Sequence, residues 1–66
     1  MKHIVILFDC KYKSQVCASL TAKRIQYSTF TDVYTGDVRV SVPYAIGVRL
    51  LAELRRSSIP HDHYLI

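Results

Sequence analysis

The apolar run Ile4-Val5-Ile6-Leu7-Phe8 constrains the fold of this chain more than any other stretch. It is far shorter than the roughly 20 apolar residues of a membrane-spanning helix, and it lacks the alternation of a half-exposed strand. A continuous apolar run of this length is typical of a strand buried on both faces, although a buried helical turn has the same pattern. We therefore predict that this run is a central strand of a small sheet.

The size of the chain limits how much apolar surface it can enclose. It has 66 residues, which predicts one domain, and half of them are hydrophobic, which argues against disorder. Because so small a domain encloses little volume, part of its apolar surface is expected to stay outside, where a homodimer or another partner would cover it. The formal net charge of +4 either favours an anionic partner or serves only to solubilise the chain.

The cysteines bear on where the protein works. Cys10 and Cys17 have neither the spacing of a redox pair nor that of a zinc-binding pair. The sequence shows no secretion signal and no stretch long enough to span a membrane. We therefore expect a cytoplasmic protein with reduced thiols and no membrane partner.

The polarity pattern predicts six elements in chain order: a strand over 2–8, a helix over 14–24, a strand within 26–34, a strand over 38–42, a helix over 44–57 and a short strand over 61–66. Ser14 is the expected N-cap of the first helix. Thr35-Gly36-Asp37 predicts a hairpin turn, and Pro43 suits the start of the second helix. The expected fold is α+β and ferredoxin-like, β-α-β-β-α-β, with a small antiparallel sheet and two helices on one face. If the last segment is disordered, the order is β-α-β-β-α.

The second helix is more apolar than one small sheet requires. Its polar arc is narrow, so the apolar flank predicts a protein interface at Tyr44, Ile46, Leu50 and Leu54. A compact chain without a catalytic set is typical of accessory proteins of bacteria, phages or plasmids. The leading hypothesis is therefore a non-catalytic protein-interaction module, an accessory or inhibitor protein that forms a homodimer and modulates a larger protein or nucleoprotein machine.

Paired basic residues and interleaved aromatic side chains suggest a second hypothesis, a small nucleic-acid-binding domain. Lysine and arginine hold phosphates, and exposed aromatic rings stack on bases. The residues expected to form this face are Lys23, Arg24, Phe30, Tyr34, Arg39, Arg55 and Arg56. The glycine-flanked aromatic motif of RNA-recognition modules with the same fold is absent.

A third hypothesis is a metal-dependent, nuclease-like enzyme. Asp9 ends the first strand, a common place for a catalytic carboxylate, and His61 and His63 would share one face of a strand. Cys10 would be a nucleophile only beside a base that lowers its pKa. Because no spacing fixes further ligands or an acid–base pair, the sequence predicts no catalytic residue, no metal site and no cofactor.

Two local resemblances to known families accompany these hypotheses. Lys2 to Asp9, the following helix and Arg24-Ile-Gln-Tyr-Ser-Thr-Phe30 resemble, over less than half of the chain, the small CRISPR adaptation nuclease-fold family, whose first strand also ends in aspartate. Lys23-Arg-Ile-Gln-Tyr27 with Val38-Arg-Val-Ser-Val-Pro-Tyr44 is similar to the DNA-damage-inducible DinI family, a small α/β regulator of the recombinase filament. That family acts through an acidic helix, whereas this chain carries Arg49, Arg55 and Arg56 there. Neither resemblance assigns a role to a residue of this chain.

Overall fold

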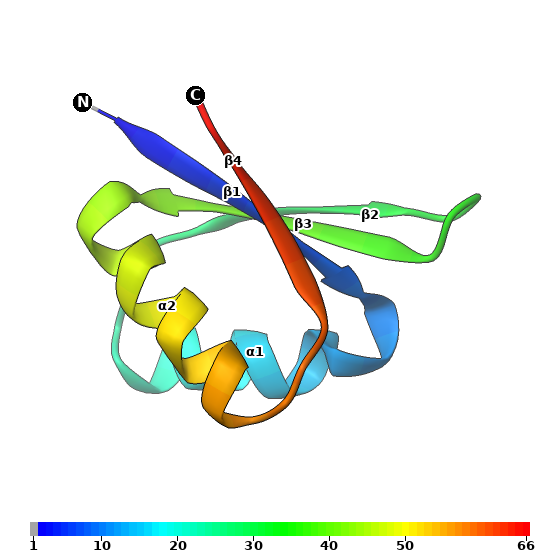
Figure 1. The fold of residues 1–66 in the computed structure, drawn as a ribbon, viewed down its shortest axis with the longest axis horizontal. Helices are drawn as coiled ribbons and strands as arrows, with labels where there is room; N and C mark the ends of the chain where they lie inside the picture. The colour runs from blue at the N-terminus through cyan, green and yellow to red at the C-terminus, as the bar shows by residue number, and fades with distance from the viewer. Residues whose placement is uncertain (1) are drawn as a thin grey trace.

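The computed structural model describes residues 2–66 as a four-stranded antiparallel sheet with two helices on one face (Figure 1). The strand order is β2-β3-β1-β4. The elements are β1 (His3–Asp9), a 3-10 turn η1 (Cys10–Tyr12), α1 (Lys13–Ala22), β2 (Ser28–Asp32), β3 (Asp37–Pro43), α2 (Tyr44–Arg56) and β4 (His61–Leu65). The predicted ferredoxin-like arrangement is confirmed, with η1 as an addition before the first helix, and the last segment forms a strand.

The run Ile4–Phe8 lies in β1, between β3 and β4, so the prediction of a central strand is confirmed. Ile4, Ile6 and Phe8 point to the helices and are buried in the core. The opposite face of the sheet has no covering layer among the described residues, so Leu7 is half-buried. Val5 is nevertheless 6% exposed, in register with Ser41 on β3 and Tyr64 on β4.

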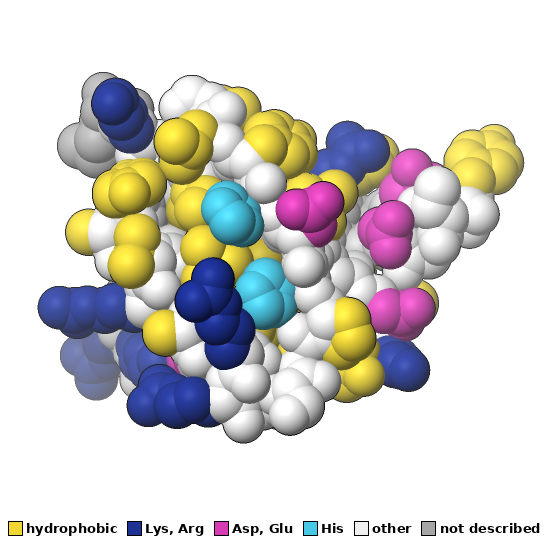
Figure 2. Space-filling view, in the orientation of Figure 1, with side chains coloured by type: hydrophobic (Ala, Val, Ile, Leu, Met, Phe, Trp, Pro, Cys, Tyr) yellow, Lys and Arg dark blue, Asp and Glu magenta, His cyan; other side chains and the backbone are white. Residues whose placement is uncertain are grey.

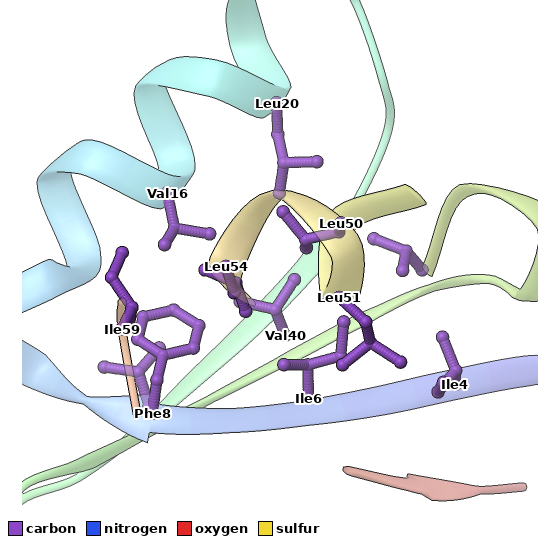
Figure 3. Packing of buried hydrophobic residues seen from close by; sticks show 12 residues of the cluster. Ile4, Ile6, Phe8, Val16, Leu20, Val40, Leu50, Leu51, Leu54 and Ile59 are labelled. Atoms are coloured by element: carbon purple, nitrogen blue, oxygen red, sulfur yellow. The ribbon is translucent and has the colours of Figure 1, made fainter. Parts of the chain in front are cut away.

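The core forms where the sheet meets the two helices (Figure 3). The alternation in β3 places three valines against the helices and Arg39 on the open face, as the sequence predicts. The helical contribution comes from Val16, Leu20, Leu50, Leu51 and Leu54. Gly47 brings α2 close to β1, because a Cβ atom built there would overlap Ile4 Cγ2.

The start of the first helix differs from the prediction. Asp9 caps η1 by accepting a hydrogen bond from the Lys11 amide at 2.9 Å. Helix α1 then continues directly from this turn with Tyr12 at its N-cap position and no side-chain cap, so the prediction of Ser14 as the N-cap is wrong. The reason is that the Asp9 carboxylate already caps a helical turn that begins at Cys10, four residues before Ser14. The helix ends at Ala22, and Arg24 has a φ of 57°.

Candidate interaction surfaces

Eight large hydrophobic side chains are exposed in the described part of the chain, and they fall into two groups. Phe30, Val33 and Tyr34 lie on β2 and the following turn. The second group belongs to α2 and the C-terminal strand: Tyr44, Val48, Tyr64, Leu65 and Ile66. Figure 2 shows hydrophobic side chains gathered around the start of α2 and the end of β4. We call Tyr44, Val48 and Leu65 the α2–β4 patch.

Strand register explains why the α2–β4 patch forms. Leu65 is paired with Ile4, and Ile4 is also the residue that Gly47 of α2 packs against. Val48 is the next residue of the helix and therefore lies beside the Ile4–Leu65 pair. The Ile66 amide donates to the His3 carbonyl at 3.1 Å, and the Tyr44 amide donates to the Lys2 carbonyl at 3.1 Å. The end of β4 and the start of α2 therefore meet at the beginning of β1, and their apolar side chains share one end of the molecule.

The patch adjoins an unpaired sheet edge, because β4 is the last strand of the sheet. His3 and Ile66 exchange both of their backbone hydrogen bonds, at 3.1 and 3.5 Å. Antiparallel pairs alternate between bonded and non-bonded, so Tyr64 and Asp62 also bond to β1. The backbone groups of His61, His63 and Leu65 consequently point away from the sheet. In agreement, the His63 amide donates to the Asp62 carboxylate at 2.8 Å instead of to β1.

The β4 edge has little protection against strand pairing. Natural edges are guarded by charged side chains, above all lysine, by proline, by bulges or by shortness. Strand β4 holds five residues in continuous register with β1, contains no lysine and no proline, and has Asp62 as its one carboxylate. The other edge, β2, is equally short and has no lysine or proline of its own, but Lys13 of α1 donates to Thr31 Oγ1 at 2.9 Å and the strand ends at Asp32, so two charged side chains lie beside this strand.

The interface predicted on α2 needs correction. Leu50 and Leu54 are 4% and 2% exposed and pack in the core, so no partner can reach them in the folded protein. Ile46 is half-buried against the core, and Tyr44 is exposed. The sequence pattern gave the breadth of the apolar face but not its orientation. The helix turns its leucines to the sheet and α1, and leaves Tyr44 and Val48 uncovered.

The residues expected to contact nucleic acid lie in two separate places. Lys23 and Arg24 follow α1, and Lys23, Arg55 and Arg56 line one open groove together with Arg49. Figure 2 shows basic side chains toward the helices and acidic ones toward the β2–β3 hairpin. The aromatic members of the set are elsewhere, so the structure does not bring the predicted stacking and phosphate-binding residues together.

The open face of the sheet carries Phe30 and Arg39, with the Arg39 guanidinium 5.4 Å from the centre of the Phe30 ring. Arg39 Nη2 also lies 4.0 Å from Asp32 Oδ2. Asp32 is in register with Asp37, and Asp37 with Asp9, which forms an acidic row across three strands. Tyr34 projects from the hairpin turn and is 97% exposed. Acidic side chains therefore border the aromatic residues, and these carboxylates would repel phosphates.

An ion pair links α2 to the end of α1. Lys23 Nζ lies 2.9 Å from Glu53 Oε2, and Ser19 Oγ donates to Glu53 Oε1 at 2.9 Å. The hydrogen bond from Lys23, followed by the one from Ser19, lowers the pKa of Glu53 below its ordinary value of 4.5. Lys23 and Glu53 line a pocket between the two helices together with Leu20, Ile46 and Leu50.

Two residues of the enzymatic hypothesis, Asp9 and His61, line one open pocket together with Asp37 and Asp62. Asp9 serves as a turn cap, and His61 Nδ1 lies 2.8 Å from the Ile59 carbonyl. His61 and His63 do share one face of β4, but residues 2–66 contain no group of three or more His, Cys, Asp or Glu side chains that could hold a metal ion. Cys10 is exposed, Cys17 is half-buried, and both are free thiols.

Comparison of the chain with protein-family models, with curated proteins and with solved structures finds no match. None of the helices described for residues 2–66 has the length and apolar character needed to cross a membrane.

Proposed function

We propose that this protein is a small non-catalytic protein-interaction module, an accessory or inhibitor protein that docks on a larger protein through the α2–β4 patch. The observation that carries this proposal is the coincidence of an exposed apolar cluster with a poorly guarded sheet edge. Strand addition at such an edge supplies backbone hydrogen bonds, while neighbouring side chains supply specificity. The free thiols are consistent with a cytoplasmic site of action.

The chemistry of the patch suits a protein partner. Tyr44, Val48 and Leu65 are about half exposed, so a partner can remove further apolar area from water at roughly 25 cal/mol per Å². Tyrosine is also among the residues that contribute most strongly to protein interfaces. Strand β4 carries no lysine or arginine that would attract a phosphate backbone.

The proposal is tested by comparing three tagged baits in a nuclease-treated lysate: the unmodified chain, Val48→Asp and Val33→Asp. Val48 lies in the patch, whereas Val33 is an exposed valine of the hairpin turn and serves as the matched control. We expect a defined set of proteins to be retained by the unmodified and Val33→Asp baits and lost by Val48→Asp. Identical profiles for all three folded baits would contradict docking at the patch.

A second candidate function, nucleic-acid binding, is supported by the basic groove along α2. Lys23, Arg49, Arg55 and Arg56 line it together with Glu53, and within residues 2–66 only Lys23 of these four cations has a carboxylate within ion-pair distance. Binding there would rest on phosphate contacts and weaken steeply with salt. A duplex titration at low and high salt, with Arg49→Gln and Arg39→Gln compared, separates the groove from the open sheet face.

A further inference from the structure

We propose that a second copy of this chain occupies the β4 edge, and that the two β4 strands pair antiparallel about a two-fold axis at His63. This inference deepens the proposed function by naming one partner of the same surface. The joined sheet has eight strands, with all four helices on one face.

The backbone of β4 suits this register. His61, His63 and Leu65 direct their amides and carbonyls outward, as derived from the His3–Ile66 pair. With His63 opposite its own copy, His61 stands opposite Leu65 of the second copy. Each residue whose amide and carbonyl point outward therefore stands opposite another such residue. Pro60 lacks an amide hydrogen and directly precedes the strand, so the paired length matches the strand itself.

The side chains of β4 are also self-complementary. On the open face of the sheet, Asp62 stands opposite Tyr64 of the second copy. Pairing redirects the His63 amide from the Asp62 carboxylate to a backbone carbonyl, and the carboxylate becomes free to accept from the Tyr64 hydroxyl. No two charged carboxylates or cations face each other across the axis in this register, and like charges in such a position would destabilise it.

The register about His63 also determines where the two α2–β4 patches lie. Helix α2 packs on β1 and β3, and strands lie about 4.8 Å apart. The distance from β1 to β1 of the second copy spans three such spacings, about 14 Å, so the two α2 helices are farther apart than the 8–10 Å of directly packed helices. Because the paired strands run antiparallel, Leu65 of each copy stands opposite His61 of the other, and each patch lies at one end of the paired strands, beside the start of the other copy's β4.

The first test measures molar mass by light scattering over a concentration series, with the 7.6 kDa monomer as reference. His63→Pro removes the outward amide without touching the β1–β4 hydrogen bonds, and His63→Ala is its matched control because it keeps the amide. We expect a dimer for the unmodified chain and for His63→Ala, and at least tenfold weaker association for His63→Pro. A monomer for the unmodified chain at all concentrations overturns the inference.

The second test reads the register and does not depend on whether the proline variant folds. In a Cys10→Ser, Cys17→Ala background, His63→Cys places two thiols on residues whose Cα atoms are about 5.5 Å apart, within disulfide reach. Tyr64→Cys places them on diagonal positions about 7–8 Å apart. We expect oxidation to cross-link the His63→Cys chain into dimers and to leave the Tyr64→Cys chain monomeric. The reverse pattern, or no cross-link in either, overturns the register.

Failure of this inference is distinguishable from failure of the proposed function. If the unmodified chain is a monomer but other proteins bind it and are lost with the Val48→Asp bait, pairing with a second copy is refuted. The proposed function as a protein-interaction module is then retained. A dimer that survives His63→Pro but is broken by Phe30→Asp moves the contact to the open sheet face and refutes pairing at β4.

Discussion

The two flanks of α2 have the same kind of side chains and opposite roles. One flank presents Leu50 and Leu54 to the sheet and α1, where both are buried. The other presents Tyr44 and Val48 beside the end of β4, where both are about half exposed. Hydrophobicity alone does not separate these flanks over the first two turns of the helix, because both are apolar there; Arg55 follows on the exposed flank. What separates them is the position of the helix on a sheet whose last strand it does not cover.

The largest expected effect comes from the buried flank. Leu54→Ala removes three carbon atoms from a nearly inaccessible site, so the free energy of unfolding should fall by about 2–5 kcal/mol. Val48→Ala on the exposed flank should cost well under 1 kcal/mol but weaken association. Urea unfolding followed by circular dichroism measures both variants. Equal losses of stability would contradict the contrast between the flanks.

A smaller effect is expected at Gly47, which sets the height of α2 above β1. Gly47→Ala would gain about 1 kcal/mol of helix propensity, but the added methyl overlaps Ile4 Cγ2, and overpacking costs about 1–3 kcal/mol. We expect a net loss of stability and a change in association, because the helix must shift and Val48 shifts with it. Ala45→Gly, at an exposed position of the same helix, measures propensity alone. A more stable Gly47→Ala chain would show that the helix accommodates the methyl.

Much of the fold is predictable from the sequence because local and global signals agree. The uniform apolar run predicts the central strand, the valine alternation predicts β3, and Gly36, with a φ of 77°, sits in the predicted turn. The orientation of α2 is not predictable in the same way. Tyr44 and Leu50 are both apolar positions of one helix, and only the packing of Gly47 on Ile4 decides which of them is buried. Of the interface positions predicted on that helix, Tyr44 is exposed and open to a partner, whereas Leu50 and Leu54 are buried and are not.

An effect on association comparable to that of Gly47→Ala is expected when a lysine is placed on one or the other edge strand. Leu65→Lys adds a cation to the β4 edge, and Thr29→Lys adds one to the β2 edge. Edge lysines oppose strand pairing, so Leu65→Lys should weaken association about tenfold, whereas Thr29→Lys should leave it unchanged. Sedimentation equilibrium measures both. Loss of association with Thr29→Lys instead would place the contact at β2.

The smallest expected effect is a pH dependence of stability that comes from Glu53, beside the buried flank of α2. The pKa of Glu53 is lowered in the folded protein, so its contribution to stability is present above about pH 4.5 and is lost as the pH falls through the folded pKa. Because Lys23 is largely exposed, the pair is worth at most about 1 kcal/mol. Glu53→Gln should flatten the acid limb of the thermal unfolding midpoint between pH 5 and pH 3. An unchanged acid limb would show that other carboxylates set it.

The unequal guarding of the two sheet edges also bears on the solubility of the protein. A sheet with two open edges can stack edge to edge without limit, as in fibre growth. Here Lys13 is bonded to Thr31 and β2 ends at Asp32, so charged side chains beside that strand oppose growth from it, and β4 is left as the more accessible side. The proposed pairing of β4 with an identical strand would close on itself after two copies and would leave no free β4 edge from which a filament could grow.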